Sequence, residues 1–435
     1  MKYIVIALIG ALASVLSNKG IAVFNDGFRP IVPQYFDGSI NRKELAAMSF
    51  AISFGLVIGF GIPTSIAATI ILIHCILLST DIIGTWCPDS NKGTILAAII
   101  GAAYGILIVV GLDFIITLFG YLPYNFLDAL GKVSVYVMAA FAIFPTVSVG
   151  SQHGFKKGCI TGIVTVLVYF FVKRFGTFAI SDGATLTLNG EGMAMLAGTV
   201  MMLIYAASVK GDNNTSNTDL VNVFSSKVSR IRKNWILLAI MGALIACGTS
   251  MLLIAGDPIS LNLASNGAYS EAALAAFARA IGFVPLVFTT AIVTGVYAPA
   301  GCTFVFVIGL LFVNNPLVAF VLGGAVMIAE LALINVFAKG MDKFPGVKDM
   351  GEHIRTSMNK VLEIALLVGG VVAAEAMSSA FGLAGAGALF VIACLLLNRL
   401  SKKPIVELAI GPVACILFGI LLNVLTVCNI ITLVA

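Results

Sequence analysis

Apolar residues occur in long runs separated by short polar segments. The runs lie near residues 3–17, 45–60, 63–80, 94–112, 133–149, 158–176 and 192–209, and then near 234–255, 271–297, 300–313, 316–338, 360–382, 384–399 and 404–426. A helix needs about 20 apolar residues to cross a bilayer, and most of these runs are near that length. The pattern predicts an all-α polytopic membrane protein with about seven hydrophobic segments in each half.

One region in the second half is apolar but interrupted. Arg279, Pro285, Gly295, Pro299 and Gly301 divide the stretch that runs from residue 271 to 316. After Pro299 only about 14 apolar residues remain, which as a helix reach ~21 Å and fall short of a ~30 Å hydrocarbon core. We therefore expect a broken or re-entrant helix near Pro299.

The first half contains similar sequence. Gly59–Ser65 echoes Gly295–Gly301, Gly27–Val32 echoes Gly282–Val287, and Ala7–Leu12 echoes Ala239–Leu244. Paired Gly/Pro-interrupted segments in two halves of a membrane protein point to a transporter's binding site. We predict a second break near Pro63 and expect both breaks to meet near mid-membrane, with chance similarity of apolar segments as the alternative. Whether 45–80 and 271–313 span or re-enter is left open.

Loop charges give an orientation. Lys and Arg gather in residues 210–233, 339–360 and 399–403, and cytoplasmic loops carry such excess. With these loops inside, both termini lie outside, and only Lys173-Arg174 departs from the rule. An odd number of segments per half then gives the halves opposite orientation. We expect two inverted repeats, 1–209 and 234–435, joined by a cytoplasmic link at 210–233.

Composition agrees with the membrane assignment. Of 435 residues, 60% are hydrophobic and 10% charged, whereas soluble domains carry about 25% charged residues. The net charge of +5 comes from loop residues and not from a basic stripe, so we expect no nucleic-acid partner. The eight cysteines stand singly, without metal-ligand spacing, and we expect no metal and no cofactor.

Polar residues near the two breaks are the candidate substrate site. Ionisable groups at membrane depth are costly, and a planar guanidinium binds carboxylate or phosphate bidentately. Arg29 and Arg279 therefore suggest an anionic substrate. Two alternatives stay open: Arg29 pairs only with Asp26, or Arg279 neutralises Glu330. The predicted substrate-binding residues are Asp26, Arg29, Thr64, Ser65, Arg279, Thr289, Thr290, Thr294, Tyr297, Thr303 and Asn315.

Two acids, Asp81 and Glu330, are predicted to couple transport to Na⁺ or H⁺. His74, alone inside an apolar run, is interpreted as a core residue rather than a proton relay. The sequence contains no P-loop, no zinc motif and no Ser/His/Asp order with a suitable context. We expect that the protein is not an enzyme.

Several of these motifs also carry a family resemblance. Phe24–Gln34 followed by Asn41–Glu44, then Arg279–Pro285 through Thr289-Thr290 to Gly295–Ala298, and finally Asn359–Glu363 and Leu421–Leu425, resemble the YhfT family of bacterial inner-membrane proteins. The resemblance extends over essentially the whole chain. It implies a multi-pass inner-membrane transporter and supplies neither a substrate nor assigned site residues.

Together these features predict a secondary active transporter for a small polar, anionic metabolite, working by alternating access. The alternative is a permease component, similar to EIIC, of a phosphotransferase-type group-translocation system. We expect membrane lipid, the small-molecule substrate and a second copy of the chain in a homodimer as partners.

Overall fold

The computed structural model describes residues 1–181, 184–209, 218–340, 345–402, 404 and 407–434. Residues 210–217 of the expected link lie outside this range. The helical elements are α1 (Lys2–Asn18), η1 (Arg29–Ile31), α2 (Val32–Phe36), α3 (Arg42–Leu56), η2 (Val57–Gly61), α4 (Ile62–Ala68), α5 (His74–Trp86), α6 (Asn91–Gly120), α7 (Leu127–His153), α8 (Phe155–Phe175), α9 (Gly190–Ala207), α10 (Thr218–Lys233), α11 (Trp235–Ser250), α12 (Pro258–Ser265), α13 (Tyr269–Thr294), α14 (Phe304–Leu311), α15 (Pro316–Gly340), α16 (Pro345–Ser379), α17 (Ala386–Leu400) and α18 (Glu407–Val427). The strands are β1 (Ile71–Leu72), β2 (Thr177–Ser181), β3 (Ala184–Thr187) and β4 (Ile254–Ala255).

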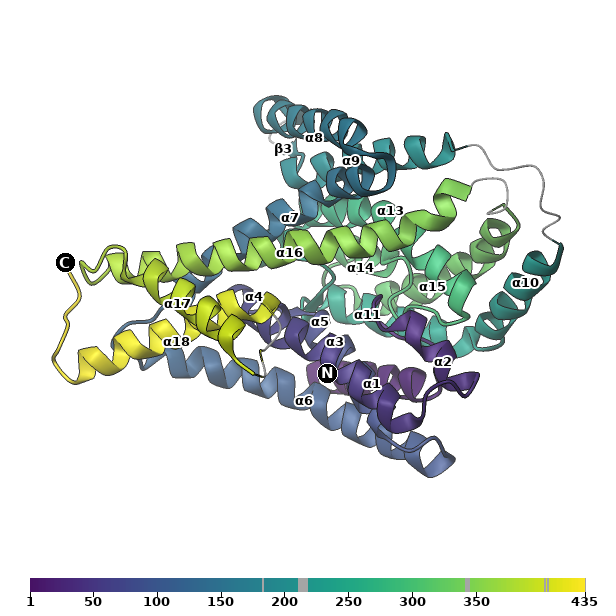
Figure 1. Ribbon diagram of the computed structural model, residues 1–435, viewed down its shortest axis with the longest axis horizontal. Coiled ribbons are helices and arrows are strands. Elements are labelled where there is room, and N and C mark those ends of the chain that lie inside the picture. The colour runs from purple at the N-terminus through teal and green to yellow at the C-terminus, as the bar shows by residue number, and fades with distance from the viewer. Residues whose placement is uncertain (182–183, 210–217, 341–344, 403, 405–406, 435) are drawn as a thin grey trace.

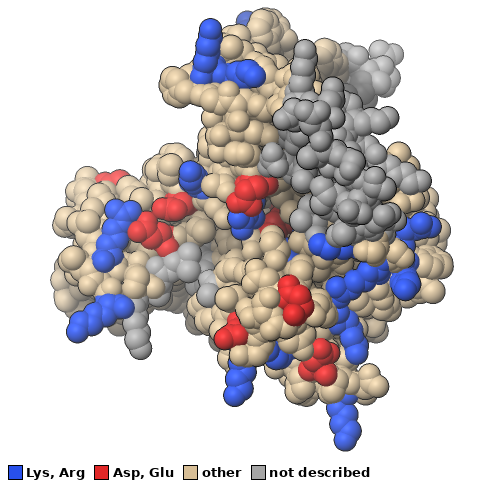
Figure 2. Space-filling model, turned by 45° about the vertical axis from the view of Figure 1, so that its right-hand side comes forward, with Lys and Arg blue, Asp and Glu red and all other residues tan. Residues whose placement is uncertain are grey.

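Long apolar helices dominate the molecule. Within the described residues, 8 helices are long and apolar enough to cross a membrane. Only 17% of the apolar window of α8 is buried against the rest of the chain. The surface in Figure 2 is correspondingly poor in charge, with Lys, Arg, Asp and Glu scattered over a mostly uncharged face. An apolar surface of this extent requires an apolar surrounding, and the molecule has the build of a multi-pass helical membrane protein.

The helices pack as two units. Unit A comprises α1, α3–α6 and α10–α15, in which α1 packs on α5 and α6, and α11 packs on α14 and α15. Unit B comprises α7–α9 and α16–α18, and its longest helices, α7 and α16, run side by side (Figure 1). The units meet where α13 packs on α9 and α16, and where η2 and α4 pack on α18 and α7.

Two very short parallel pairings cross-link distant segments inside unit A. Ile71 and Leu72 of β1 pair with Ile254 and Ala255 of β4. A single bridge joins Ala22 to Tyr297, with the Tyr297 amide donating to the Ile21 carbonyl at 3.0 Å. Each pairing satisfies backbone groups exposed where a helix is interrupted, which is necessary in an interior without water.

The second break matches its prediction in position. α13 ends at Thr294, Gly295 takes a left-handed conformation with φ 73°, and the chain turns until α14 starts at Phe304. α14 has 8 residues and is shorter than the apolar run suggested. Gly295 supplies the positive φ that ends a helix cheaply.

The first break lies later than expected. Pro63 sits in the first turn of α4, where a missing N–H costs no hydrogen bond, and the chain stays helical from α3 through the π-helical turn η2 into α4. α4 ends at Ala68, and the next residue, Thr69, has a left-handed φ of 57° although it is not a glycine. Residues 63–80 are therefore an interrupted segment, and the break is near Thr69 and not at Pro63.

The sequence echoes do not match in conformation. Gly27–Val32 forms a turn, the whole of η1 and the first residue of α2, whereas Gly282–Val287 lies inside the continuous helix α13. Gly59–Ser65 is helical, whereas Gly295–Gly301 is the break itself.

Candidate functional site

A cavity of about 390 Å³ lies between units A and B. Phe60 of η2 and His74 of α5, which lie on either side of the first break, line its wall together with Ala298, Ala300 and Gly301 from the second break. Unit B closes it with Phe141 of α7, residues of α16 and Leu408 of α18. The helices that flank the first break and the second break itself therefore contribute to one cavity, whose size suits a metabolite-sized ligand.

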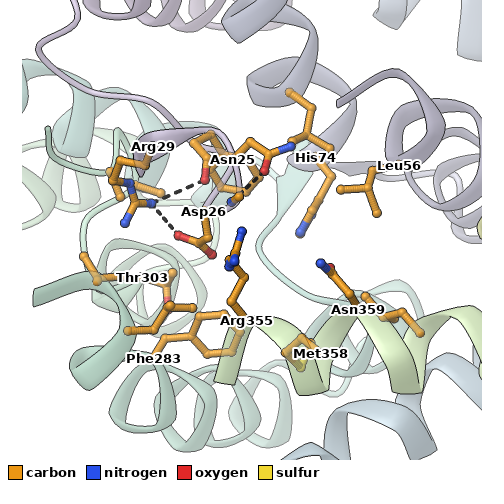
Figure 3. Close-up of a pocket in the computed structure, with 18 of the residues that line it drawn as sticks. Asn25, Asp26, Arg29, Leu56, His74, Phe283, Thr303, Arg355, Met358 and Asn359 are labelled. Carbon is orange, nitrogen blue, oxygen red and sulfur yellow. Dashed lines mark hydrogen bonds and ion pairs between the residues drawn. The ribbon is translucent and has the colours of Figure 1, made fainter. Parts of the chain in front are cut away.

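Arg29 anchors one side of this cavity. Its side chain is 1% exposed and lies 2.5 Å from a carboxylate oxygen of Asp26 (Figure 3). Its other donors reach the carbonyls of Val23 and Phe24 and the hydroxyl of Thr290. Because most of its donors are used within the protein, Arg29 fixes the loop that precedes η1 and has little capacity left for a ligand.

Asp81 holds the same loop from behind. This buried side chain on α5 accepts the backbone N–H groups of Phe24 and Asn25 at 2.8–3.1 Å. Phe24 and Asn25 line the cavity, whereas Asp81 does not. The geometry gives Asp81 a role in positioning the cavity wall.

Arg279 is a buried cation for which the described residues supply no ion pair. It lies on α13, is 4% exposed and lines the cavity. Its Nε has no hydrogen-bond partner among the described residues, and none of the ion pairs formed there includes it. Its guanidinium carbon stands 4.6 Å from the centroid of the Phe283 ring. Asp257 and Asp26 are the acids that act on it through space, and each is already bonded to another group.

His74, at the start of α5, also lines the cavity, which its interpretation as a core residue did not anticipate. The ring meets Phe24 and Phe60 edge-on, with centroids 5.0 Å apart in each pair. Its Nδ1 is buried and has no partner within the described chain. The sequence placed the break near Pro63 and His74 inside the apolar run that follows, so it gave no signal for this role.

Unit B contributes two polar groups that sequence reasoning also missed. Arg355 and Asn359, one turn apart on α16, face the cavity opposite Asp26 and His74 (Figure 3). Arg355 forms a bidentate pair with the exposed Glu352. The apolar run that was predicted to start at residue 360 placed these residues in a loop, so their helical face could not be read.

Glu330 lies behind the cavity wall. Its Oε2 accepts the hydroxyl of Tyr297 at 2.9 Å and the backbone N–H of Cys302 at 2.7 Å. Among the described residues no ion pair joins Arg279 to Glu330, an arrangement that does not favour the suggested neutralisation of Glu330 by Arg279.

The remaining predicted site residues lie at various distances from the cavity. Thr303 lines it, with a buried hydroxyl that has no partner in the described structure. The others serve the helices around it: Thr64 is buried in α4, Ser65 binds Gly61 and Leu72, Thr289 faces Gly351, Thr290 binds Arg29, Thr294 caps the end of α13, and Asn315 is exposed just before α15.

The cavity is cationic with aromatic walls. Among the described residues that line it, three carry a guanidinium (Arg29, Arg279 and Arg355) and one, Asp26, carries a carboxylate. No group of three or more His, Cys, Asp or Glu residues within the described part of the chain is arranged to hold a metal ion. Such a site can bind a small organic anion through Arg279 and place an apolar body against Phe60, Phe141 and Phe283.

Comparison with known proteins identifies the family. A family named YhfT, described as "Protein of unknown function", matches residues 2–431. The chain belongs to the YhfT family. It is 36% identical over 441 residues to a protein of Escherichia coli (strain K12) named "Uncharacterized protein YhfT", an alignment that covers 98% of this chain and 97% of the relative. No solved structure matches the chain.

Proposed function

We propose that this protein is a secondary transporter that carries a small organic anion across the bacterial inner membrane, and that the cavity between units A and B is its substrate site. The observation that carries the proposal is Arg279. A cation buried in an apolar surrounding is costly unless it is paired, and among the described residues Arg279 has no bonded partner. An anionic substrate would complete the site.

The stacking of Arg279 on Phe283 supports this role. A guanidinium that lies over an aromatic ring gains about 0.5–2 kcal/mol and keeps its planar edge free for a carboxylate. The Phe283 ring therefore holds the charged group in place without using its hydrogen-bond donors.

The packing of the helices supports an inverted repeat, although the residues of two of the sequence echoes are not equivalent. In each half the first helix, α1 or α11, packs on the short helix after the break, α5 or α14, and on the next long helix, α6 or α15. Each half then adds a three-helix group to unit B, α7–α9 or α16–α18.

One sequence echo supports the same correspondence. Gly10 of Ala7–Leu12 is in close contact with Gly101 of α6, and Gly242 of Ala239–Leu244 is in close contact with Gly323 of α15. Side chains larger than hydrogen would separate these helices. The strand pairings fit as well, because a segment after the first helix of each half pairs with the segment after the broken helix of the other.

This arrangement gives a mechanism for alternating access. Asp26, Arg29 and Arg279 belong to unit A, whereas Arg355 and Asn359 belong to unit B. Relative movement of the two units would open the cavity first to one side of the membrane and then to the other. Arg355, whose partner Glu352 is exposed, can exchange that partner for the substrate or for Asp26 as the units move.

The test uses purified protein in detergent and in proteoliposomes. Small carboxylates with an apolar body should raise the melting temperature, whereas their uncharged amides should not. The carboxylate that stabilises most should then be taken up unmodified by proteoliposomes without a phosphate donor. A requirement for a phosphate donor, or phosphorylated product, would favour group translocation instead.

Variants of Arg279 connect this activity to the cavity. Arg279→Ala should abolish stabilisation by the anion, and Arg279→Lys should weaken it because an ammonium lacks the bidentate fork. Arg174→Ala is the matched control, since Arg174 is an exposed residue at the end of α8 and remote from the cavity lining. Wild-type uptake by Arg279→Ala would remove the basis of the proposal.

A further inference from the structure

The carboxyl group of Glu330 is buried, as is the guanidinium of Arg279, but it lies outside the substrate cavity. Glu330 is 4% exposed on α15, and its Oε2 binds Tyr297 and Cys302, which flank the turn Ala298–Gly301. Gly301 has φ 55°, and a Cβ there would lie 2.2 Å from Glu330 Oε2. The chain therefore needs glycine at 301 for the carboxyl group to come this close.

The other oxygen of Glu330 is unsatisfied. Oε1 is buried and has no hydrogen-bond partner among the described residues. The titratable neighbours on the break are Tyr297 and Cys302, neither of which is a cation. An ionised carboxylate without a counter-charge is costly in such a surrounding, and the cost is removed when a proton binds.

Within the described residues, no cation on the other packed elements forms an ion pair with Glu330. α14 has no ionisable residue, and α11 contributes only Cys247 within its helix. Lys227 of α10 packs beside Gly295, at the far end of the break, and Arg279 of α13 faces the cavity. No ion pair within the described residues includes Glu330.

In the first half of the chain, the long helix is tied to the short helix after the break without an acidic residue. From α6, the hydroxyl of Tyr104 binds the Cys75 carbonyl at 2.9 Å and the Ser79 hydroxyl at 2.7 Å in the first turns of α5. A neutral group is thus sufficient to tie a long helix to the short helix after a break. Packing of α15 against the second break therefore does not by itself require an acid, and Glu330 has a role beyond packing.

We propose that Glu330 binds and releases the proton that drives transport, so that the protein is an anion–proton symporter. This inference rests on the proposed function. In the step itself the carboxylate oxygen forms an O–H bond with a proton from solvent and later returns it to solvent. Sodium fits less well, because the neighbours of Oε2 are hydrogen-bond donors, and hard cations need several oxygen ligands.

The break links the proton to the substrate. Ala298, Ala300, Gly301 and Thr303 line the cavity, whereas Tyr297 and Cys302, in the same turn, hold Glu330. Protonation weakens the carboxyl group as an acceptor for these two donors, and so changes how firmly the cavity wall is held to α15.

The decisive variant is Glu330→Gln, in which an amide oxygen can still accept from Tyr297 and Cys302 but no proton is exchanged. Anion binding, measured by thermal shift, and exchange of labelled for unlabelled anion should persist. Accumulation driven by a pH gradient, about tenfold per pH unit for wild type at one proton per anion, should disappear. Accumulation by Glu330→Gln equal to that of wild type would overturn the proposal, as would dependence of wild-type uptake on Na⁺.

A second variant keeps the test valid if Glu330→Gln does not fold. Tyr297→Phe removes one donor to the carboxylate, which favours the protonated form and should move the pH midpoint of uptake upward. An unchanged midpoint would contradict the role of Glu330. Asp113→Asn, which changes an exposed acid of α6 paired with Lys2, should leave the gradient response intact. Wild-type anion uptake that does not depend on pH would refute only the proton-coupling role of Glu330. Absence of any anion uptake would refute the proposed function.

Discussion

Arg29 donates a hydrogen bond of 2.5 Å to the hydroxyl of Thr290, a residue 261 positions later in the chain. This contact joins the loop before η1 to the middle of α13, and both elements supply residues to the cavity. The buried guanidinium thereby connects the two halves of the sequence at the candidate site.

Loss of this contact should destabilise the protein. Thr290→Val keeps the shape of the side chain but removes the acceptor for Arg29, and a hydrogen bond to a charged group contributes about 1.5–3 kcal/mol. We expect a lower melting temperature in detergent and weaker anion binding. Thr117→Val is the control, because the Thr117 hydroxyl on α6 only bonds back to the Asp113 carbonyl of its own helix. Equal melting temperatures for the two variants would show that the hydrogen bond between Arg29 and Thr290 does not stabilise the protein.

Asp26 should affect stability and affinity in opposite directions. Its carboxylate partly compensates Arg29 but also places a negative charge in the cavity. Asp26→Asn retains an acceptor oxygen for Arg29, so we expect a stability loss of about 1–2 kcal/mol, below that for breaking a fully buried pair. Anion affinity should increase, because one repulsive charge is gone. Calorimetric titration with the stabilising carboxylate measures this effect, and weaker binding by a folded Asp26→Asn would contradict the assignment of an anionic substrate.

Substitutions at Gly301 and Gly38 separate the cost of left-handed backbone strain from the cost of a side-chain clash. Both have positive φ, 55° and 81°, but a Cβ at 301 would meet Glu330 whereas a Cβ at 38 meets nothing within 4 Å. Gly38→Ala should cost about 1–2 kcal/mol from left-handed strain alone. Gly301→Ala adds displacement of the buried carboxylate and should lower the melting temperature considerably more. A similar effect of both substitutions would indicate that the Glu330 contact is unimportant.

The orientation predicted from loop charge can be tested with cysteine labelling. Native Cys428 is exposed beyond the end of α18, on the side where the charge rule places the outside. A membrane-impermeant maleimide should label it in intact cells, and Cys428→Ser should remove that signal. A cysteine introduced at Lys402, in the basic loop before α18, should react only after the cells are opened. The reverse pattern would invert the orientation.

The sequence alone determined the class of the protein and the position of its second helix break. Length and apolarity of the runs are local properties, and a chain with so few charges must bury its backbone polar groups in helices within a bilayer. Gly295 likewise marks the end of α13 by its own conformational preference. Asp26, Arg29, Arg279 and Thr303 were predicted as site residues because polar groups are rare in such a chain, and all four line the cavity.

Tertiary structure decided what those residues do. The sequence could not distinguish Arg29, whose donors are consumed by Val23, Asp26 and Thr290, from Arg279, whose charge has no bonded partner among the described residues. His74, Arg355 and Asn359 line the cavity only because the fold places α5 and α16 at its border. Contacts between residues hundreds of positions apart depend on how helices pack, and helix packing is set by the summed fit of many side chains rather than by any local pattern.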